Sequence, residues 1–286
     1  MTVELDHDTT VAALTRRLAG AGIPAAAAEA RWLVEHVTAT RSTAAPPQDR
    51  LEVLVRRRLA GEPLQLLLGR WPFRTVELTL EPGVFVPRPE TEVVAGIAID
   101  HARRLGRPAL VAEPCTGSGA IACALVAEVD GIEVVATDVE PQAVALARRN
   151  LAAVRDATAA VTRRSRGEVH LGDLLDPLPP SLRGRLDLLV ANPPYLPLGD
   201  RDGMATEVVD HDPARALFGG PDGHEVVDRL VGLAGDWLGP GGSLVVELDD
   251  RRGEDAAARA RAVGLRQVRI ERDLAGRDRA LVAVAP

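Results

Sequence analysis

Apolar residues near the start of the chain recur at the spacing of an α-helix. Over residues 9–39 they share one helical face, and the pattern is broken once, between Gly20 and Pro24. A shorter helical pattern covers residues 51–59. These segments predict a small helical domain over residues 1–74.

A different pattern follows this helical segment. Residues 75–86 alternate between apolar and polar side chains, and they contain the pair Pro82 and Gly83. Alternation around a turn dipeptide is typical of a β-hairpin. We therefore assign residues 75–90 to a hairpin that links two domains.

From residue 91 to the end, short apolar runs alternate with helical patterns. Strands are expected over 108–113, 132–138, 167–171, 186–191 and 242–248, and helices over 91–105, 119–128, 141–153, 222–238 and 252–263. This alternation predicts a parallel, doubly wound sheet of the Rossmann-like kind. Residues 266–272 and 279–284 have no helix between them, so they predict an antiparallel pair at the sheet edge. Residues 91–286 thus read as one α/β domain.

The composition is that of a globular protein, with 46% hydrophobic and 26% charged residues. No run of about 18 apolar residues is present, and the acidic, polar start differs from a secretory signal. Two cysteines, Cys115 and Cys123, are too few for a disulfide framework or a structural zinc site. We expect a cytoplasmic protein with no metal centre and no membrane partner.

The net charge of −7 argues against direct nucleic-acid binding. The charge is uneven, because residues 1–74 carry +2 and the remainder carries −9. The helical segment is therefore the more favourable face for an acidic partner. The run Arg56 to Arg58 offers candidate contacts.

A glycine-containing loop follows the first strand of the α/β domain. It reads Glu113-Pro-Cys-Thr-Gly-Ser-Gly119, and its glycines at 117 and 119 permit a tight turn and close approach of a ligand to the backbone. Each glycine taken alone could be a plain turn residue. Glu113 would repel a pyrophosphate, so the loop suits a nucleoside that carries an amino acid.

Two further acids follow the next two strands. A carboxylate at Asp138 can accept hydrogen bonds from ribose hydroxyls, and Asp173 can accept one from an adenine amino group. Ligands of open α/β folds bind at the carboxyl ends of the strands. Acids at three successive strand ends therefore predict one cofactor crevice.

The fourth strand is followed by Asn192-Pro193-Pro194-Tyr195. A planar NH₂ group carries two N–H donors, and the Asn192 side-chain oxygen and a proline carbonyl can accept them. The prolines restrict the backbone and so hold these acceptors in place. This arrangement would orient a poorly nucleophilic amide and stabilise charge that develops on its nitrogen. Tyr195 can pack on the plane of the substrate.

Further segments carry a specific resemblance. They are GEPLQLLLGRWPF (61–73), FVPRPETE (85–92), EPCTGSGAIA (113–122), VANPPYLP (190–197), HDPARALFGGPDG (211–223) and DLAGRDR (273–279). Together they resemble the PrmC/HemK family, protein-(glutamine-N5) methyltransferases that act on the GGQ loop of peptide chain release factors. The resemblance implies a class I methyltransferase fold, a helical substrate-recognition domain and S-adenosylmethionine (SAM) as the cofactor.

The resemblance also implies roles for individual residues. The implied cofactor-binding residues are Glu113, Cys115, Thr116, Gly117, Ser118, Gly119, Asp138, Asp173, Leu174 and Asn192. The implied catalytic residues are Asn192, Pro193, Pro194 and Tyr195. Arg88 and Glu92 are implied near the mouth of the site, although either could instead form a structural ion pair.

The sequence leaves two candidates for the methyl acceptor. The first is the GGQ glutamine of a release factor. The second is a small molecule with a planar NH₂ group, such as the guanidine of free arginine, for which Glu90, Glu92, Asp210 and Asp212 are candidate carboxylate partners. An adenine-N6 methyltransferase is disfavoured because the α/β segment is acidic and no domain for recognising a nucleic-acid target is evident.

Overall fold

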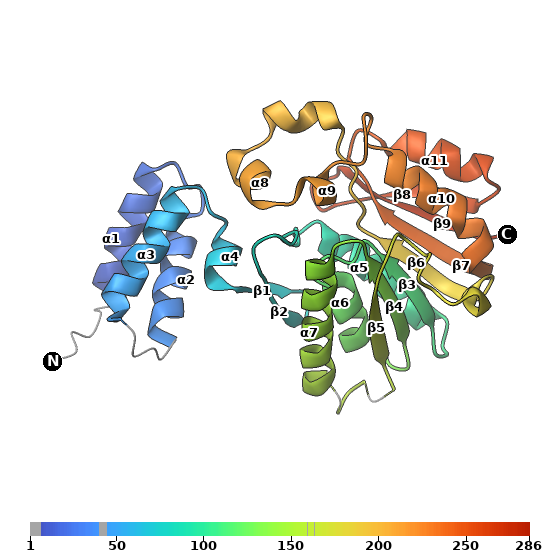
Figure 1. The fold of residues 1–286 in the computed structure, drawn as a ribbon, viewed down its shortest axis with the longest axis horizontal. Coiled ribbons are helices and arrows are strands. Elements are labelled where there is room, and N and C mark those ends of the chain that lie inside the picture. The colour runs from blue at the N-terminus through green and yellow to red at the C-terminus, as the bar shows by residue number, and fades with distance from the viewer. Residues whose placement is uncertain (1–6, 40–44, 159, 163) are drawn as a thin grey trace. The chain divides into compact units, whose positions relative to one another are not determined.

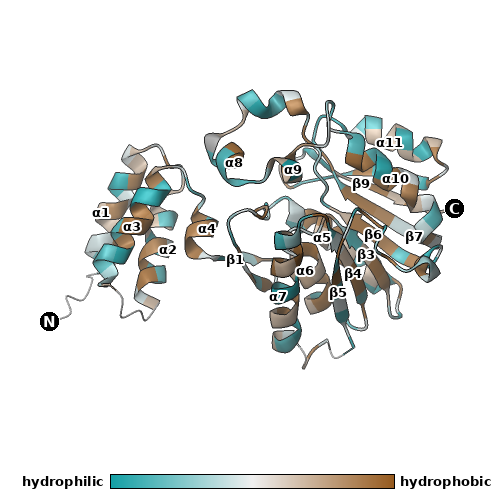
Figure 2. Cartoon of the chain, in the orientation of Figure 1, coloured by the Kyte–Doolittle hydropathy of each residue, from teal (hydrophilic) through white to brown (hydrophobic). Residues whose placement is uncertain are grey.

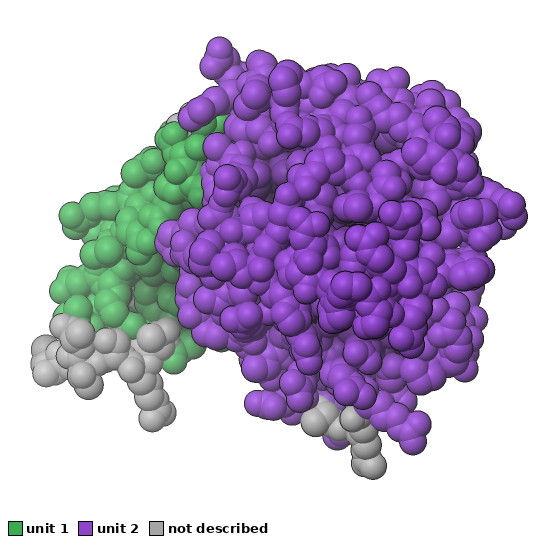
Figure 3. All heavy atoms as spheres, turned by 45° about the vertical axis from the view of Figure 1, so that its right-hand side comes forward, with its two compact units in different colours: residues 1–70, 206–211 green, residues 71–205, 212–286 purple. Residues whose placement is uncertain are grey.

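The computed structural model describes residues 7–39, 45–158, 160–162 and 164–286. The chain forms two compact units, drawn in different colours in Figure 3. The helical unit comprises residues up to 70 together with 206–211, and the α/β unit comprises residues 71–205 and 212–286. No helix among the described residues is long and apolar enough to cross a membrane.

The helical unit packs amphipathic helices around an apolar interior. Its helices are α1 (His7–Gly20), α2 (Ala26–Ala39), α3 (Pro47–Leu59), α4 (Leu64–Leu68) and α8 (Thr206–His211). Leu18, Leu33 and Val55 are buried where α1, α2 and α3 meet. The short helices α4 and α8 were not predicted, because so few residues carry no helical period.

A buried ion pair lies inside the helical unit. Arg58 on α3 donates from Nε and Nη2 to the Glu29 carboxylate on α2 at 2.6 and 3.1 Å, and from Nη1 to Glu207 on α8 at 3.2 Å. The expectation that Arg56 to Arg58 together face a partner is therefore wrong for Arg58, which is buried. Arg57 is paired with Glu62.

The α/β unit is built on a seven-stranded sheet with the order β5-β4-β3-β6-β7-β9-β8 (Figure 1). The strands are β3 (Leu110–Pro114), β4 (Glu133–Asp138), β5 (Arg166–Leu171), β6 (Leu186–Ala191), β7 (Leu238–Glu247), β8 (Arg266–Arg272) and β9 (Asp278–Val284). The first five are parallel, and β9 pairs antiparallel with both β7 and β8. The predicted Rossmann-like sheet and its antiparallel C-terminal pair are confirmed.

Helices cover both faces of this sheet. These helices are α5 (Thr91–Arg104), α6 (Ala120–Glu128), α7 (Pro141–Thr158), α10 (Glu225–Trp237) and α11 (Gly253–Ala262). The unit also contains the short helix α9 (Ala214–Leu217). The helices α5, α6 and α7 pack beside one another, whereas α10 and α11 share a separate apolar core with the strands. Figure 2 shows the central strands mostly in hydrophobic colours, as expected for strands buried on both faces.

The hairpin lies earlier in the chain than predicted. The structure forms a two-stranded sheet from β1 (Arg70–Phe73) and β2 (Val76–Thr79), and residues 80–90 contain no strand. The turn falls at Arg74, which has a positive φ of 52°. Arg74 is anchored there by hydrogen bonds of 2.8 and 2.9 Å from its Nε and Nη2 to Glu128 on α6. The position of the turn is thus set by the bond to Glu128, 54 residues away, and not by the turn dipeptide Pro82-Gly83.

Arg58→Met tests the buried ion pair of the helical unit. The substitution leaves the Glu29 carboxylate buried without its partner, so we expect the free energy of unfolding to fall by about 3–5 kcal/mol. The measurement is urea denaturation of the full chain followed by circular dichroism. Arg56→Met is the matched control, because that side chain is 71% exposed and should change stability by no more than about 0.5 kcal/mol. Equal effects of the two variants would contradict this account of Arg58.

Candidate active site

The carboxyl ends of the parallel strands meet at one edge of the sheet and surround a cavity of about 430 Å³. Ten of the residues implied at the site line it, namely Glu113, Cys115, Thr116, Gly117, Ser118, Asp138, Asp173, Leu174, Asn192 and Pro194. The structure therefore brings together segments that are separated by many residues in the sequence. The implied residues Gly119, Pro193, Tyr195, Arg88 and Glu92 do not line this cavity.

The glycine loop has an unusual backbone path. Cys115, Gly117 and Gly119 all have positive φ values, of 60°, 56° and 81°. The Thr116 N–H donates to the Thr137 carbonyl at 3.0 Å, and the Gly117 N–H donates to Asp138 Oδ2 at 2.8 Å. These bonds hold the loop against the end of β4 and leave its backbone turned toward the cavity.

Asn150 on α7 holds the same loop from behind. Its Nδ2 donates to the carbonyls of Ser118 and Thr79 at 2.9 and 3.0 Å, and its Oδ1 accepts from the Thr79 N–H at 2.9 Å. Asn150 is buried, so these bonds satisfy an otherwise costly polar group. This role of Asn150 was not predicted, and the scarcity of asparagine in the chain is the one feature of the sequence that points to it.

The acids at the strand ends are in different environments. Glu113 is buried, its Oε2 has no hydrogen-bond partner among the described residues, and burial raises the pKa of this carboxyl well above its usual value. Burial also raises the pKa of Asp138, against the effect of N–H bonds from Glu140 and Gly117. A buried acceptor without a partner at the cavity wall suits the polar amino-acid end of a ligand.

The third acid lies at the rim of the cavity. Asp173 Oδ2 accepts from Arg229 Nη2 at 2.7 Å, and both side chains are roughly half exposed. Leu174 has a positive φ of 45°, and its carbonyl accepts from the Thr137 hydroxyl at 2.5 Å. This bond places Leu174 against the cavity as an apolar wall.

The Asn-Pro-Pro-Tyr segment leaves the end of β6 and passes along the cavity. Asn192 Nδ2 donates to the Thr91 hydroxyl at 3.0 Å, so the side-chain oxygen of Asn192 is the group left for a ligand. The segment is held by residues 217–220, since the Leu196 N–H donates to the Leu217 carbonyl and the Gly219 N–H to the Leu196 carbonyl. A Cβ atom at Gly219 would lie 2.4 Å from the Pro194 carbonyl oxygen. Only glycine therefore fits beside Pro194.

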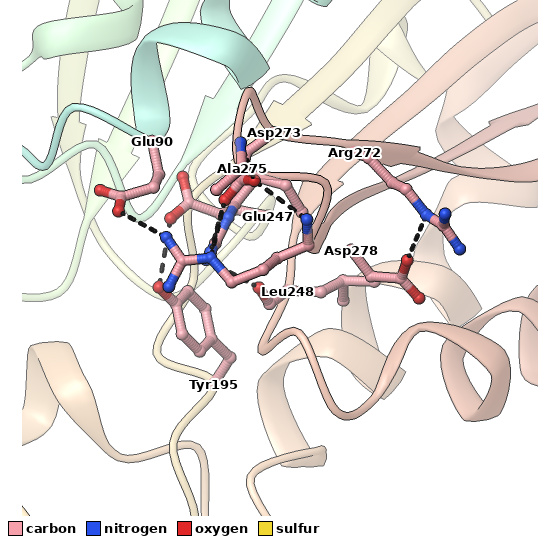
Figure 4. A network of polar contacts seen from close by, with 10 residues as sticks. Glu90, Tyr195, Glu247, Leu248, Arg272, Asp273, Ala275 and Asp278 are labelled. Atoms are coloured by element: carbon pink, nitrogen blue, oxygen red, sulfur yellow. Dashed lines mark hydrogen bonds and ion pairs between the residues drawn. The ribbon is translucent and has the colours of Figure 1, made fainter.

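Tyr195 is not among the residues that line the cavity. Its hydroxyl donates to Glu247 Oε1 at 3.2 Å, and its ring packs against the core that contains Leu248 (Figure 4). Glu247 is 0% exposed, and burial raises its pKa to about 7. The expected stacking of Tyr195 on a substrate stays a prediction, whereas its bond to Glu247 was not foreseen.

The two residues implied at the mouth have structural partners. Arg88 forms an ion pair with the buried Asp212 and lies over the Phe85 ring, 5.1 Å from its centroid. Asp212 also accepts from the Val86 N–H at 3.1 Å. The Glu92 carbonyl accepts from Arg74 at 3.2 Å.

Several cavity residues were not singled out from the sequence. They are Phe85, Thr91, Arg215, Phe218 and Arg229. Thr91 lies in the PRPETE segment, which carried the resemblance without indicating what its threonine contacts. Among the described residues, no group of His, Cys, Asp and Glu side chains could hold a metal ion.

The fold and the site together define a class of protein. A Rossmann-like sheet with an antiparallel C-terminal strand pair, a glycine loop after its first strand and an acid after its second is the architecture of class I SAM-dependent methyltransferases. The Glu113 carboxyl, whose Oε2 has no partner among the described residues, the loop residues that line the cavity, and Asp138 fit the amino-acid and nucleoside parts of SAM.

Comparison with known proteins identifies the family. Residues 10–69 match the model of the PrmC N-terminal domain, and residues 107–224 match the methyltransferase small domain. The chain is 42% identical over 251 residues to the release factor glutamine methyltransferase of Streptomyces coelicolor, covering 85% of each chain. It is 38% identical over 275 residues to that of Deinococcus radiodurans, covering 93% of each. The chain belongs to the release factor glutamine methyltransferase family.

Solved structures agree on the fold alone. A methyltransferase from Pyrococcus furiosus has a TM-score of 0.52 and 18% identity, over 83% of this chain and 96% of that one. A 16S rRNA methyltransferase from T. thermophilus, solved with AdoMet and guanosine, has a TM-score of 0.50 and 17% identity, over 76% of this chain and 50% of that one.

Gly119→Ala tests the glycine loop. The new Cβ would lie 3.1 Å from the Ala147 Cβ, and φ is 81°, so we expect a loss of about 1–2 kcal/mol in the free energy of unfolding. Displacement of the loop should also weaken SAM binding by about tenfold, measured by calorimetry. Gly232→Ala is the control, because this exposed helical glycine has open space around it and should bind SAM normally. Unchanged SAM affinity in Gly119→Ala would contradict the assigned loop.

Glu247→Gln tests the buried carboxyl by pH. The pKa of Glu247 is raised from 4.5 to about 7, so the folded chain binds its proton more tightly than the unfolded chain does. The stability that this group contributes is present below pH 4.5 and is lost as the pH rises through 7, by about 3 kcal/mol in full. We expect wild type to lose stability relative to Glu247→Gln over this range in urea denaturation. A constant difference between the two proteins would contradict the raised pKa.

Proposed function

We propose that this chain transfers a methyl group from SAM to the side-chain amide nitrogen of the GGQ glutamine of peptide chain release factors. The observation that carries the proposal is the Asn192 amide, whose nitrogen is bound to Thr91 and whose oxygen is left for a planar N–H donor. The sequence relatives support it, since they bear the name release factor glutamine methyltransferase over most of their length.

SAM, when bound, supplies a methyl group on a positively charged sulfur. The glycine loop, Glu113 and Asp138 would hold its methionine and ribose parts, and Asp173 and Leu174 would border its adenine. The chain's own task is then to place the acceptor nitrogen. An amide whose plane is held in a fixed orientation can point a π lobe of its nitrogen toward the methyl group. Correct placement also removes much of the entropic barrier of a two-molecule reaction.

Asn192 would accept one N–H of the glutamine amide through its side-chain oxygen. A carbonyl of Pro193 or Pro194 would accept the other, because the segment is pinned by residues 217–220. These acceptors stabilise positive charge that develops on the nitrogen during transfer. No strong base is required, since the proton leaves after the new bond forms. The helical unit, which matches the PrmC N-terminal domain, would bind the body of the release factor.

The small-molecule alternative is less well supported. A guanidinium would need a free carboxylate near the cavity. Of the candidates, Asp212 is ion-paired with Arg88 and Glu90 with Arg277. Their charge is therefore already compensated.

Methyl transfer from labelled SAM tests the proposal. The wild-type chain should label a purified release factor, and the label should vanish when the GGQ glutamine is replaced by alanine. Asn192→Ala should lower the rate by about 100–1000-fold while SAM binding changes little, because one positioned polar group is removed from the reacting nitrogen.

Free arginine and free glutamine serve as parallel acceptors in this assay. Label on a free small molecule, with none on the release factor, would reject the proposed substrate. Undiminished turnover by Asn192→Ala would remove Asn192 from the reaction.

A further inference from the structure

A tight turn between β8 and β9 presents one apolar side chain to solvent. Leu274 in this turn is fully exposed, and no other large apolar residue that the structure describes is as exposed. The turn belongs to the DLAGRDR segment (273–279), none of whose residues line the cavity. Single exposed leucines are common on protein surfaces, so the rigidity and the position of this turn decide whether Leu274 has a function.

Hydrogen bonds to Asp273 hold the turn in one conformation. Its Oδ1 accepts from the backbone N–H groups of Ala275 and Arg277 at 2.9 and 3.0 Å. Its Oδ2 accepts from Arg279 Nη2 at 3.2 Å, and both of these side chains are almost completely buried. The fixed backbone keeps Leu274 exposed. A partner that covers Leu274 therefore has little disorder in the turn to remove, which favours binding.

The strand pairing places this turn at the edge of the sheet where the cavity lies. β9 runs antiparallel to β7, and Glu247 at the end of β7 pairs with Ala280 near the start of β9. The turn that precedes β9 therefore lies at the carboxyl edge of the parallel strands. Arg277 Nη2 also lies 3.4 Å from Oε1 of Glu90, the residue before the cavity residue Thr91 (Figure 4).

The turn is near the cavity but outside it. Asn192 follows β6, and β7 lies between β6 and β9 in the sheet. The end of β6 and the start of β9 are therefore two strand spacings apart, which is about 10 Å. A free amino acid whose NH₂ group binds Asn192 is too short to span this distance and cover Leu274 as well. A protein that inserts one glutamine into the cavity can do both.

The charges around Leu274 are compensated. Arg272 is paired with Asp278 at 3.1 Å, and Arg277 with Asp273 at 3.3 Å. The turn thus offers an apolar contact and no surplus of positive charge. It suits an apolar depression on a protein, whereas a nucleic acid would favour arginines without acidic partners.

We infer that Leu274 is a docking contact for the protein substrate, and that it packs into an apolar depression of the release factor beside the GGQ loop. This inference rests on the proposed function, because it presupposes a protein that brings a glutamine to Asn192. Leu274 touches no reacting atom in this assignment. It contributes equally to binding before and during methyl transfer, so it acts on the affinity for the protein and not on the rate of the chemical step.

Steady-state kinetics of Leu274→Ser in the full chain test the inference, with a release factor and labelled SAM. Loss of one buried leucine contact should raise the KM for the release factor by about 10–100-fold and leave kcat unchanged. The dissociation constant of SAM, measured by calorimetry, should also stay the same. Leu274→Met keeps an apolar side chain of similar volume and should restore most of the affinity.

Val161→Ser is the matched control. Val161 is 78% exposed and lies between α7 and β5, at the opposite edge of the sheet. This variant removes an exposed apolar side chain far from the cavity, so the KM for the release factor should not change. Both serine variants should keep the wild-type melting temperature, because neither side chain is buried. A wild-type KM in Leu274→Ser would overturn the inference.

A short synthetic peptide with the Gly-Gly-Gln sequence separates docking from damage to the active site. The peptide lacks the body of the release factor, so Leu274→Ser and the wild type should methylate it with the same kcat/KM. An equal loss of kcat/KM on the peptide and on the release factor would place the defect in the cavity and overturn the docking role.

Analytical ultracentrifugation distinguishes the release factor from a second copy of this chain as the partner that covers Leu274. We expect Leu274→Ser to sediment as the wild type does. A wild-type dimer that Leu274→Ser dissociates would assign Leu274 to self-association and overturn the inference.

The proposed function and this inference fail in different ways. A release factor that the wild-type chain does not label would reject the proposed function, and the docking role with it. A release factor that wild type and Leu274→Ser label with the same KM would overturn the docking role alone and leave the proposed function standing.

Discussion

The parallel pairing of β3 with its two neighbours is the constraint on which the whole site depends. β3 pairs with β4 on one side and with β6 on the other, so three strands end at the same edge of the sheet. The glycine loop, Asp138 and Asn192 follow these three ends and line one cavity. A shift of one residue in register would turn every side chain of the shifted strand to the opposite face, and the residues of the site would no longer meet at one cavity.

Buried polar side chains hold the loops that follow these strands. Asn150 binds the glycine loop, Asp212 binds the backbone of Val86, and Glu247 binds Tyr195. Each comes from a distant part of the chain. Because a buried polar group without a partner is costly, each of these bonds favours one arrangement of its loop. Side chains that mostly lie outside the cavity lining therefore fix the conformation of the site.

Features that depend on local pattern were predictable, and features that depend on distant partners were not. The strands follow apolar runs, so β6 was predicted at its observed bounds of residues 186–191. The hairpin was predicted too late in the chain, because the turn at Arg74 depends on Glu128. The arginine run on α3 gave no sign that Arg58 would be buried with Glu29.

The sequence by itself determined the α/β alternation, the glycine loop, the acids at the strand ends and the Asn-Pro-Pro-Tyr segment, since each is written in neighbouring residues. Only the tertiary structure decided which side of the Asn192 amide faces the cavity. That choice depends on Thr91, which lies 101 residues before Asn192 and accepts from its Nδ2. Spacing along a chain does not encode such contacts, because a hydrogen bond depends on where folding brings its two atoms.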